Sequence, residues 1–398
     1  MVEQTNSKVP QIRFKGFEGE WVETPLGSIT DSYSGGTPSV GNRSYYNGNI
    51  PFIRSGEINS TKTELKISKT GLKNSSAKLV RKGDVLYALY GATSGEVGVS
   101  QLNGAINQAI LAILPKSGNS SEFLAIWLRC KKDWIVRTYL QGGQGNLSGN
   151  IVKSLAPAIP PHTEQAQIGG YFKELDGMIG LHQRKHGKLV TLKQAMLQKM
   201  FPQNGATTPE IRFKGFEEPW VEKELRVAGE FNPKADIPET FEYVDLESVV
   251  GTQMVSHRTE RKATAPSRAQ RVARPGDLFF QTVRPYQKNN HLFILPLDNY
   301  VFSTGYAQIR PFNDGSFLLA LMQRDQFIKV VLDNCTGTSY PAINSSDLAK
   351  IPVELPTPKE QQKIGTYFRQ LDTLISKHAT QLEKLKQLKS ACLEKMFV

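Results

Sequence analysis

The stretch at Pro160–Pro202 decides the fold, PPHTEQAQIGGYFKELDGMIGLHQRKHGKLVTLKQAMLQKMFP. A closely similar sequence is repeated at Leu355–Val398, LPTPKEQQKIGTYFRQLDTLISKHATQLEKLKQLKSACLEKMFV. Matching residues keep one offset, 360 − 164 = 196, so no insertion separates the two copies. Prolines stand at the start of each copy and none interrupts it. This pattern predicts one continuous helix in each copy, roughly 38 residues and about 57 Å long.

A stripe of mostly apolar residues recurs along both copies at the seven-residue spacing of a coiled coil. The positions are Leu175, His182, Leu189 and Met196 in the first copy, and Leu371, His378, Leu385 and Cys392 in the second. Further apolar residues widen the stripe, namely Ile179, Leu192, Ile375, Leu382 and Leu388. Neither helix can bury such a stripe alone, so we expect the two to pack antiparallel as a spacer between two globular halves. We interpret the matching histidines as seam residues rather than metal ligands.

A second, nearly identical repeat precedes each half, PQIRFKGFEGEWVE at Pro10–Glu23 and PEIRFKGFEEPWVE at Pro209–Glu222. Its apolar residues alternate with charges, which favours a short extended segment that anchors itself to a neighbouring core. The second anchor follows the first helix closely, whereas the second helix has no anchor after it. The duplication is therefore circular, and we expect Pro10 to lie near Met396.

The two stretches between anchors and helices, Leu26–Pro157 and Leu225–Val353, share an outline but little sequence. Short β-rich runs are expected at residues 50–53, 84–90 and 109–114, and again at 243–246, 277–281 and 307–310. The turns Arg81–Asp84 and Arg274–Asp277 each lead into a strand. An amphipathic helix is expected in both, Ser121–Leu140 with Phe123, Trp127, Cys130 and Trp134 in the core, and Ser316–Cys335 with Leu318, Met322, Ile328 and Leu332.

Composition limits the class of partner and the cellular compartment that the protein can have. The chain of 398 residues carries a formal charge of +12, which favours a polyanion such as nucleic acid. Its three cysteines are scattered and predict neither a disulfide framework nor a zinc site, which indicates a reducing cytoplasm. No apolar run is long enough to span a membrane, and Met1–Lys8 is too polar for a signal peptide.

No motif for catalysis is found in the sequence. The Walker A, zinc protease, nucleophile-elbow and Cys-x-x-Cys patterns are all missing, as are the motifs by which amino-methyltransferases hold a flipped base. We therefore favour a binding protein. Two alternatives stay open: a single-chain DNA-modifying enzyme with an unrecognised active site, and a tandem-domain structural or adhesive protein.

Basic residues crowd one segment of each variable stretch, at Lys62–Lys82 and at Arg258–Asn290. Arginine and asparagine can form paired hydrogen bonds with base edges, while lysine mostly holds phosphate. The candidate DNA-binding residues are Gly36, Thr37, Arg43, Tyr45, Arg54, Lys73 and Lys78 in the first half, and Arg258, Arg261, Lys262, Arg284, Tyr286, Lys288 and Asn289 in the second.

These motifs carry a family resemblance. The Pro-Pro-x-x-Glu-Gln-x-x-Ile run that leads to Leu175-Asp176, and its repeat up to Asp372, resemble the helical regions of type I restriction–modification specificity subunits. The runs Gly35–Ser39, Ile50–Ile58 and Lys82–Leu86 are similar to that family's target-recognition domains. The second half departs from the pattern, because it lacks a Gly-Gly-Thr-Pro counterpart and has Asp245-Leu246-Glu247 in place of Arg-Ser-Gly.

The resemblance implies an α+β fold with two α/β target-recognition domains, separated by the long antiparallel helices in a pseudo-two-fold circular arrangement. The implied domains are residues 1–157, 158–202, 203–353 and 354–398. Each recognition domain would read one half of a bipartite, asymmetric site in double-stranded DNA, and the helices would set the gap between the halves.

The resemblance also implies partners. Two modification (methyltransferase) subunits would dock on the helices, and restriction or motor subunits would join them. S-adenosylmethionine, ATP and Mg would be bound by those subunits, and this chain would hold no cofactor and no metal. The implied docking residues are Glu164, Gln165, Ile168, Phe172 and Asp176, with their equivalents Glu360, Gln361, Ile364, Phe368 and Asp372.

Overall fold

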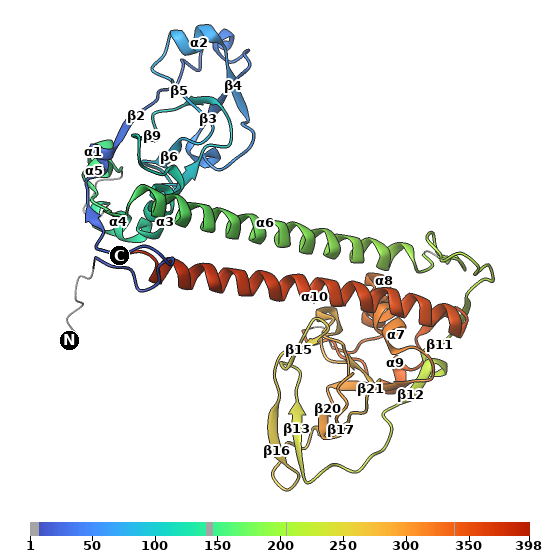
Figure 1. The fold of residues 1–398 in the computed structure, drawn as a ribbon. Coiled ribbons are helices and arrows are strands. Elements are labelled where there is room, and N and C mark those ends of the chain that lie inside the picture. The colour runs from blue at the N-terminus through green and yellow to red at the C-terminus, as the bar shows by residue number, and fades with distance from the viewer. Residues whose placement is uncertain (1–7, 141–145, 204, 338) are drawn as a thin grey trace. The chain divides into compact units, whose positions relative to one another are not determined.

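A computed structural model describes residues 8–140, 146–203, 205–337 and 339–398 (Figure 1). The sequence expectation for Met1–Lys8 therefore lies outside the described residues except at its last position. The chain forms two compact units, of which unit 1 falls within Met1–His182 and Gln381–Val398, and unit 2 is Gln183–Thr380. Each long helix is thus shared between the two units, whereas the sequence had suggested that the helices form separate segments.

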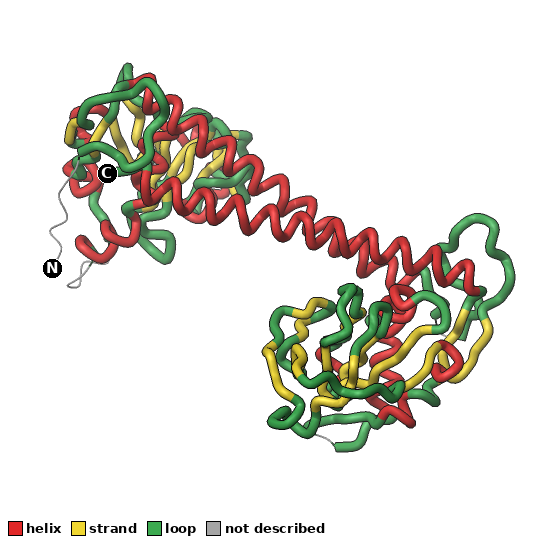
Figure 2. Tube along the Cα trace, turned by 60° about the horizontal axis from the view of Figure 1, so that its bottom comes forward, coloured by secondary structure: helices red, strands yellow, loops and turns green. Residues whose placement is uncertain are grey.

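Both long helices are present as predicted. Helix α6 runs over His162–Lys199 and α10 over Pro358–Lys395, 38 residues each, and Figures 1 and 2 trace both without a break. Within the described part of the chain, no helix is long and apolar enough to cross a membrane, and no group of His, Cys, Asp or Glu could hold a metal ion.

The helices pack antiparallel inside each unit, as the repeat predicts. In unit 1 the ammonium of Lys389 lies 2.6 Å from the carboxylate of Asp176. The equivalent pair in unit 2 is Lys193 with Asp372, at 2.5 Å. Leu192 and Leu388, however, are 39% and 45% exposed, so they do not belong to the buried stripe. A pair of helices covers only the faces that meet, and these equivalent positions lie outside that contact.

The two anchors close the units as the circular duplication predicts. The backbone N–H of Ile12 donates to the carbonyl of Lys395 (2.9 Å), and that of Ile211 donates to the carbonyl of Lys199 (2.8 Å). Trp21 and the equivalent Trp220 are almost fully buried, whereas the side chains of Ile12 and Ile211 are partly exposed. The anchor is therefore held by its tryptophan and its backbone.

Each unit contains two four-stranded sheets with one shared topology. In unit 1 the orders are β2-β9-β6-β7 and β4-β3-β8-β5, and in unit 2 they are β12-β21-β18-β19 and β16-β13-β20-β17. The unit 1 strands are β2 Thr30–Ser34, β3 Ile50–Ile53, β4 Leu65–Ile67, β5 Lys78–Val80, β6 Val85–Ala88, β7 Val97–Val99, β8 Gly104–Ile106 and β9 Ile110–Pro115. Those of unit 2 are β12 Gly229–Phe231, β13 Thr240–Val244, β16 Arg258–Arg261, β17 Ala269–Val272, β18 Leu278–Gln281, β19 His291–Leu292, β20 Tyr300–Ser303 and β21 Tyr306–Pro311.

In both units one pair of strands is parallel, β3 with β8 and β13 with β20, and the other pairs within these sheets are antiparallel. Short ribbons join the anchors to the segments before the long helices: β1 Val22–Glu23 with β10 Ala158–Ile159, and β11 Val221–Glu224 with β22 Pro352–Leu355. A further ribbon in unit 2 is β14 Val249–Val250 with β15 Gln253–Met254. The short helices are α1 Leu26–Ile29, α2 Lys69–Lys73, α5 Gly149–Ser154 and α9 Ser345–Leu348, with 3-10 turns η1 Arg43–Tyr45, η2 Ser55–Glu57, η3 Leu225–Ala228 and η4 Pro285–Gln287.

The matching turns before β6 and β18 have the same hydrogen bonds. The carboxylate of Asp84 accepts from the backbone N–H of Arg81 (2.7 Å), and that of Asp277 accepts from the N–H of Arg274 (2.8 Å). Gly83 and Gly276 adopt φ of +100° and +96°, the left-handed region that favours glycine. Aspartate and glycine at these spacings are therefore what the turn requires.

Each predicted amphipathic helix is two helices. The first is α3 Ser121–Cys130 and α4 Lys132–Tyr139, and the second is α7 Gly315–Met322 and α8 Asp325–Asp333. The second break follows from Arg324, which adopts an extended conformation so that its guanidinium can donate to the carbonyl of Pro202 (2.7 Å). Trp134 lies after the first break and is 50% exposed, so it is not a core residue, whereas Phe123 and Trp127 are.

Glycine at one position of each long helix allows a close helix contact. A Cβ on Gly365 of α10 would lie 1.9 Å from Asp314 Oδ1 and 2.8 Å from the backbone nitrogen of Phe317, at the start of α7. At the equivalent Gly169 of α6 a Cβ would lie 2.9 Å from Glu122 Cβ. The neighbouring Gly170 has no atom within 4 Å of the position of such a Cβ.

We therefore expect Gly365→Ala to destabilise the protein by about 2 kcal/mol, because α10 must move off α7 and the Asp314 cap is disturbed. Gly170→Ala, the control, should stabilise by about 1 kcal/mol, since alanine is the better helix former at an open position. Chemical denaturation followed by tryptophan fluorescence measures both. Equal effects of the two substitutions would show that the contact at Gly365 carries no stability.

Candidate nucleic-acid interface

In unit 1 a cavity of about 640 Å³ opens where β3 and β8 end. It is lined by Thr37, Val40, Arg43, Tyr46, Asn47, Phe52, Arg54, Leu65 and Asn107. Three of the sequence-predicted residues, Thr37, Arg43 and Arg54, are therefore brought together. The parallel register pairs Ile53 with Ile106, so Arg54 and Asn107 follow directly at the same edge.

Polar side chains of this cavity were missed by the sequence prediction. Asn107 lies far from Asn47 in sequence, and only the parallel pairing of β3 with β8 brings its strand to this edge. Tyr46 donates its hydroxyl proton to the carbonyl of Pro38 (2.6 Å), and Thr37 donates to the Gln108 side chain (2.6 Å). No spacing in the sequence signals these contacts.

Arg54 is held in place by two carboxylates. Its guanidinium pairs with Glu57 at 3.2 Å and also contacts Glu64. Burial opposes ionisation of Glu57, but the hydrogen bonds from Arg54 and from the backbone of Glu64 outweigh it, and the pKa of Glu57 lies below its usual value. Arg54 therefore has a fixed position, and part of its charge is compensated.

The remaining candidates of unit 1 lie outside this cavity. Tyr45 and Lys73 belong to η1 and α2, which pack together, and Lys78 is exposed on β5. Gly36 is buried, and a Cβ there would lie 2.6 Å from the Cβ of Ser76. The glycine is thus explained by a close crossing of two chain segments, and it offers no surface to DNA.

In unit 2 a cavity of about 470 Å³ holds the residues around η4. It is lined by Leu246, Glu247, Val249, Val250, Gln281, Val283, Arg284, Gln287, Asn289 and Tyr340. Arg284 and Asn289 were predicted from the sequence. Gln281 and Gln287, which share a hydrogen bond of 2.8 Å, were not. The side-chain oxygen of Gln281 is buried and accepts no hydrogen bond from the described residues.

Arg284 is the cation in the lining of this cavity, and its backbone and side chain are both held in place. It adopts the left-handed conformation (φ 55°), which is strained for a residue with a side chain. Its backbone N–H donates to the carbonyl of Pro341 (2.8 Å), and its guanidinium lies 4.4 Å from the ring centre of Tyr340, which is 64% exposed. Among the described residues no ion pair includes Arg284, so its charge is available to a ligand.

The other candidates of unit 2 are arranged differently. Lys288 also has a positive φ, but its ammonium binds the carbonyl of Gln323 (3.0 Å) and Asp325 (2.5 Å), while Tyr286 is half exposed on η4. Arg261 is exposed at the end of β16, and Lys262 lies 3.9 Å from Glu239.

Arg258 of β16 pairs with Asp245 (2.7 Å) and Glu260 (2.8 Å). Burial opposes ionisation of Asp245, but hydrogen bonds from Arg258 and Ser248 outweigh it and hold the pKa of Asp245 below its usual value. The Asp245-Leu246-Glu247 segment, which stands where the first half has Arg-Ser-Gly, thus provides the carboxylate of Asp245 that holds Arg258 on the neighbouring strand.

The structure places most of the expected docking residues inside their own unit. Glu164 and Glu360 have no exposed side-chain surface and form paired hydrogen bonds with Arg13 and Arg212, at 2.7–2.8 Å and 2.8 Å. The other buried members are Gln165, Ile168, Phe172, Gln361, Ile364 and Phe368. Only Asp176 and Asp372 are partly exposed, and both pair with lysines. Buried side chains offer no surface to a partner, so these residues hold each unit together.

Comparison with known proteins identifies relatives over most of the chain. The family model of the type I restriction modification DNA specificity domain matches residues 18–191 and 282–387. The HindI specificity subunit of Haemophilus influenzae is 24% identical over 163 residues, which cover 39% of this chain and 35% of that subunit. The MjaVIII specificity subunit of Methanocaldococcus jannaschii is 20% identical over 348 residues, which cover 78% of this chain and 77% of that one.

A solved structure has a similar fold. The S subunit of a type I restriction-modification system from M. genitalium superposes with a TM-score of 0.59 at 15% identity, over 98% of this chain and 99% of that one. At this identity the likeness establishes the fold.

We expect Arg212→Ala to destabilise unit 2 by about 3 kcal/mol, because it leaves the buried Glu360 carboxylate without its partner. Lys199→Ala, which removes the exposed pair with Glu210 (2.6 Å), is the control and should cost less than about 1 kcal/mol. Chemical denaturation measures both. A docking role for Glu360 predicts the reverse result, unchanged stability with weaker binding of a partner protein.

Proposed function

Because the chain belongs to the family of type I restriction modification DNA specificity domains, we propose that it is a subunit that recognises a specific DNA sequence for a type I restriction–modification complex. Each unit would read one half of a bipartite, asymmetric site. The observation that carries this proposal is that two units of one sheet topology hold different polar side chains in their cavities. Two different cavities on one scaffold suit two different half-sites.

The side chains of the two cavities match the chemistry of base recognition. Arg43 in unit 1 and Arg284 in unit 2 can form paired hydrogen bonds with guanine, and asparagine or glutamine can do so with adenine. The net charge of +12 supplies the contacts with phosphate that are independent of sequence. In this proposal methylation and cleavage belong to partner subunits, which would bind S-adenosylmethionine, ATP and Mg. The alternative of a single-chain DNA-modifying enzyme requires turnover by this chain alone.

The proposal is tested by selecting DNA sequences from a random pool with the wild-type complex and with the variants Arg43→Ala and Arg284→Ala. Each substitution should relax the preference in one half-site only, by about 1–3 kcal/mol at the affected base pair. Arg261→Ala, on an exposed strand end outside both cavities, should lower affinity evenly over all sequences.

The modular interpretation fails if Arg43→Ala and Arg284→Ala change the same half-site, or if both leave the selected sequence intact. Methyl transfer from S-adenosylmethionine by the purified chain without added subunits would favour the enzyme alternative instead.

For the two modification subunits we propose docking on exposed apolar side chains of the long helices. Met178 and Leu181 of α6 and Leu388 of α10 are 43–45% exposed in unit 1, and Leu192 and Leu374 are 39% and 43% exposed in unit 2. Met178 corresponds to Leu374 and Leu192 to Leu388 by the repeat offset, since 374 − 178 = 388 − 192 = 196. Equivalent apolar positions in both units suit two copies of one partner.

Met178→Lys or Leu374→Lys should therefore leave one modification subunit bound where the wild-type chain binds two, because a buried lysine disfavours one of the two contacts. Native mass spectrometry of the reconstituted complex counts the subunits. Ile294→Lys, at a 68% exposed loop position, is the control and should retain both. Two bound subunits in all three variants would show that the docking surface lies elsewhere.

A further inference from the structure

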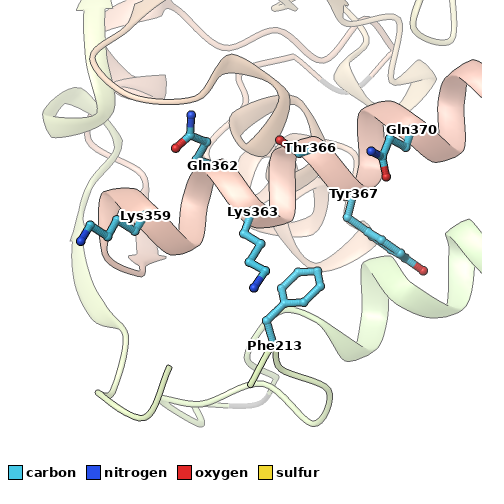
Figure 3. Close-up of a pocket in the computed structure, with 7 residues that line it drawn as sticks. All are labelled: Phe213, Lys359, Gln362, Lys363, Thr366, Tyr367 and Gln370. Atoms are coloured by element: carbon cyan, nitrogen blue, oxygen red, sulfur yellow. The ribbon is translucent and has the colours of Figure 1, made fainter. Parts of the chain in front are cut away.

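The start of α10 in unit 2 carries a pocket of about 460 Å³ (Figure 3). It is lined by Phe213, Lys359, Gln362, Lys363, Thr366, Tyr367 and Gln370. The lining contains two ammonium groups and no carboxylate. Figure 3 shows the Phe213 ring beside the ammonium of Lys363, with Tyr367 on the next turn of the helix.

The charges of this pocket are uncompensated within the chain. Among the described residues no ion pair includes Lys359 or Lys363. The nearest acid in sequence, Glu360, is buried and bound by Arg212. The ammonium of Lys363 lies 5.2 Å from the ring centre of Phe213 and 5.8 Å from that of Phe216, which fixes it over an aromatic surface.

Unit 1 has the same aromatic contact without the charges. Phe14 and Tyr171 pack edge to face at 5.8 Å, as Phe213 and Tyr367 do at 6.1 Å. At the positions equivalent to Lys359, Lys363 and Gln370, however, the first copy has Thr163, Gln167 and Glu174. The aromatic pair is therefore explained by the shared scaffold, and the positive charge is specific to unit 2.

We propose that this pocket binds an acidic segment of a protein partner, with a carboxylate between Lys359 and Lys363 and an apolar side chain on the rings of Phe213 and Tyr367. Charge complementarity favours an anion, and the aromatic floor favours a protein segment over a DNA phosphate, which has no apolar group to place there. The amides of Gln362 and Gln370 can both donate to and accept from a peptide backbone. Because the first copy lacks the charges, one segment binds per chain.

The probe is a fluorescein-labelled peptide in which Glu and Leu alternate, titrated against the full-length chain by anisotropy, with calorimetry for the stoichiometry. We expect one peptide per chain, and on the order of tenfold weaker binding to the double variant K359T/K363Q, because two attractive charges are lost. The introduced residues are those that unit 1 already carries at these positions, so the fold should tolerate them.

A reciprocal variant sharpens the test. T163K/Q167K/E174Q gives unit 1 the charges of unit 2 and should raise the stoichiometry from one peptide to two. The matched control is K223T/K234Q, which removes two exposed lysines of unit 2 outside the pocket and should bind the peptide as the wild-type chain does.

Four results would overturn the proposal. If K223T/K234Q weakens peptide binding as much as K359T/K363Q does, the attraction is a general effect of charge. If a peptide with Gln in place of Glu binds equally well, the contact is purely apolar. An unchanged stoichiometry for the reciprocal variant would show that the lysines do not form the site. If K359T/K363Q weakens duplex DNA binding and leaves the peptide affinity intact, the pocket contacts DNA. None of these results bears on base selection by the two cavities.

Discussion

The core of each unit is completed by a phenylalanine just beyond the end of a long helix that begins in the other unit. Phe397 stacks on Phe123 at 5.4 Å and lies 6.3 Å from Trp21, rings that come from the first third of the chain. In unit 2 the equivalent Phe201 lies 5.6 Å from Phe317 and 5.8 Å from Trp220. These aromatic contacts require both long helices to be complete and in register, because a helix that ended early would leave each cluster without its central ring.

This constraint separates the parts of the chain that must stay alike from those that can differ. The anchor, the first turns of each long helix and the last turn of the other helix share one set of contacts, including the buried carboxylates of Glu164 and Glu360. In unit 1 the core around Phe397 draws on β6, β7 and β9, and among the described residues the sheet of β3 and β8 contributes none to it. Side chains at the ends of β3 and β8, or at η4, can therefore change without disturbing the scaffold. A protein that must read new DNA sequences with an unchanged assembly needs such a division.

The repeats made much of the fold predictable. Fixed offsets and seven-residue spacing predicted two continuous helices, their antiparallel packing and the closure of the first anchor on the end of the second helix. The matching aspartate turns predicted the strands that follow them. Helix breaks were missed because α3 with α4, and α7 with α8, keep an apolar period across the break. Only the burial of Arg324 against Phe201 explains why the second break is needed.

The candidate sites were less predictable, and the reason is physical. Strand pairing brings Asn107 to Arg54, and no local pattern encodes a contact across half a domain.

Sequence identity between the repeats also misled the prediction of docking residues, because residues that recur are those that the scaffold requires. Glu164, Gln165 and their equivalents recur for burial, whereas the exposed residues that meet partners differ more freely. Lys359 and Lys363 are an example. They differ from the equivalent Thr163 and Gln167, so a search for identical positions in the two copies passes over them. In a duplicated protein, identical positions therefore report the shared core, and the departures between copies are the better guide to where one copy binds something that the other does not.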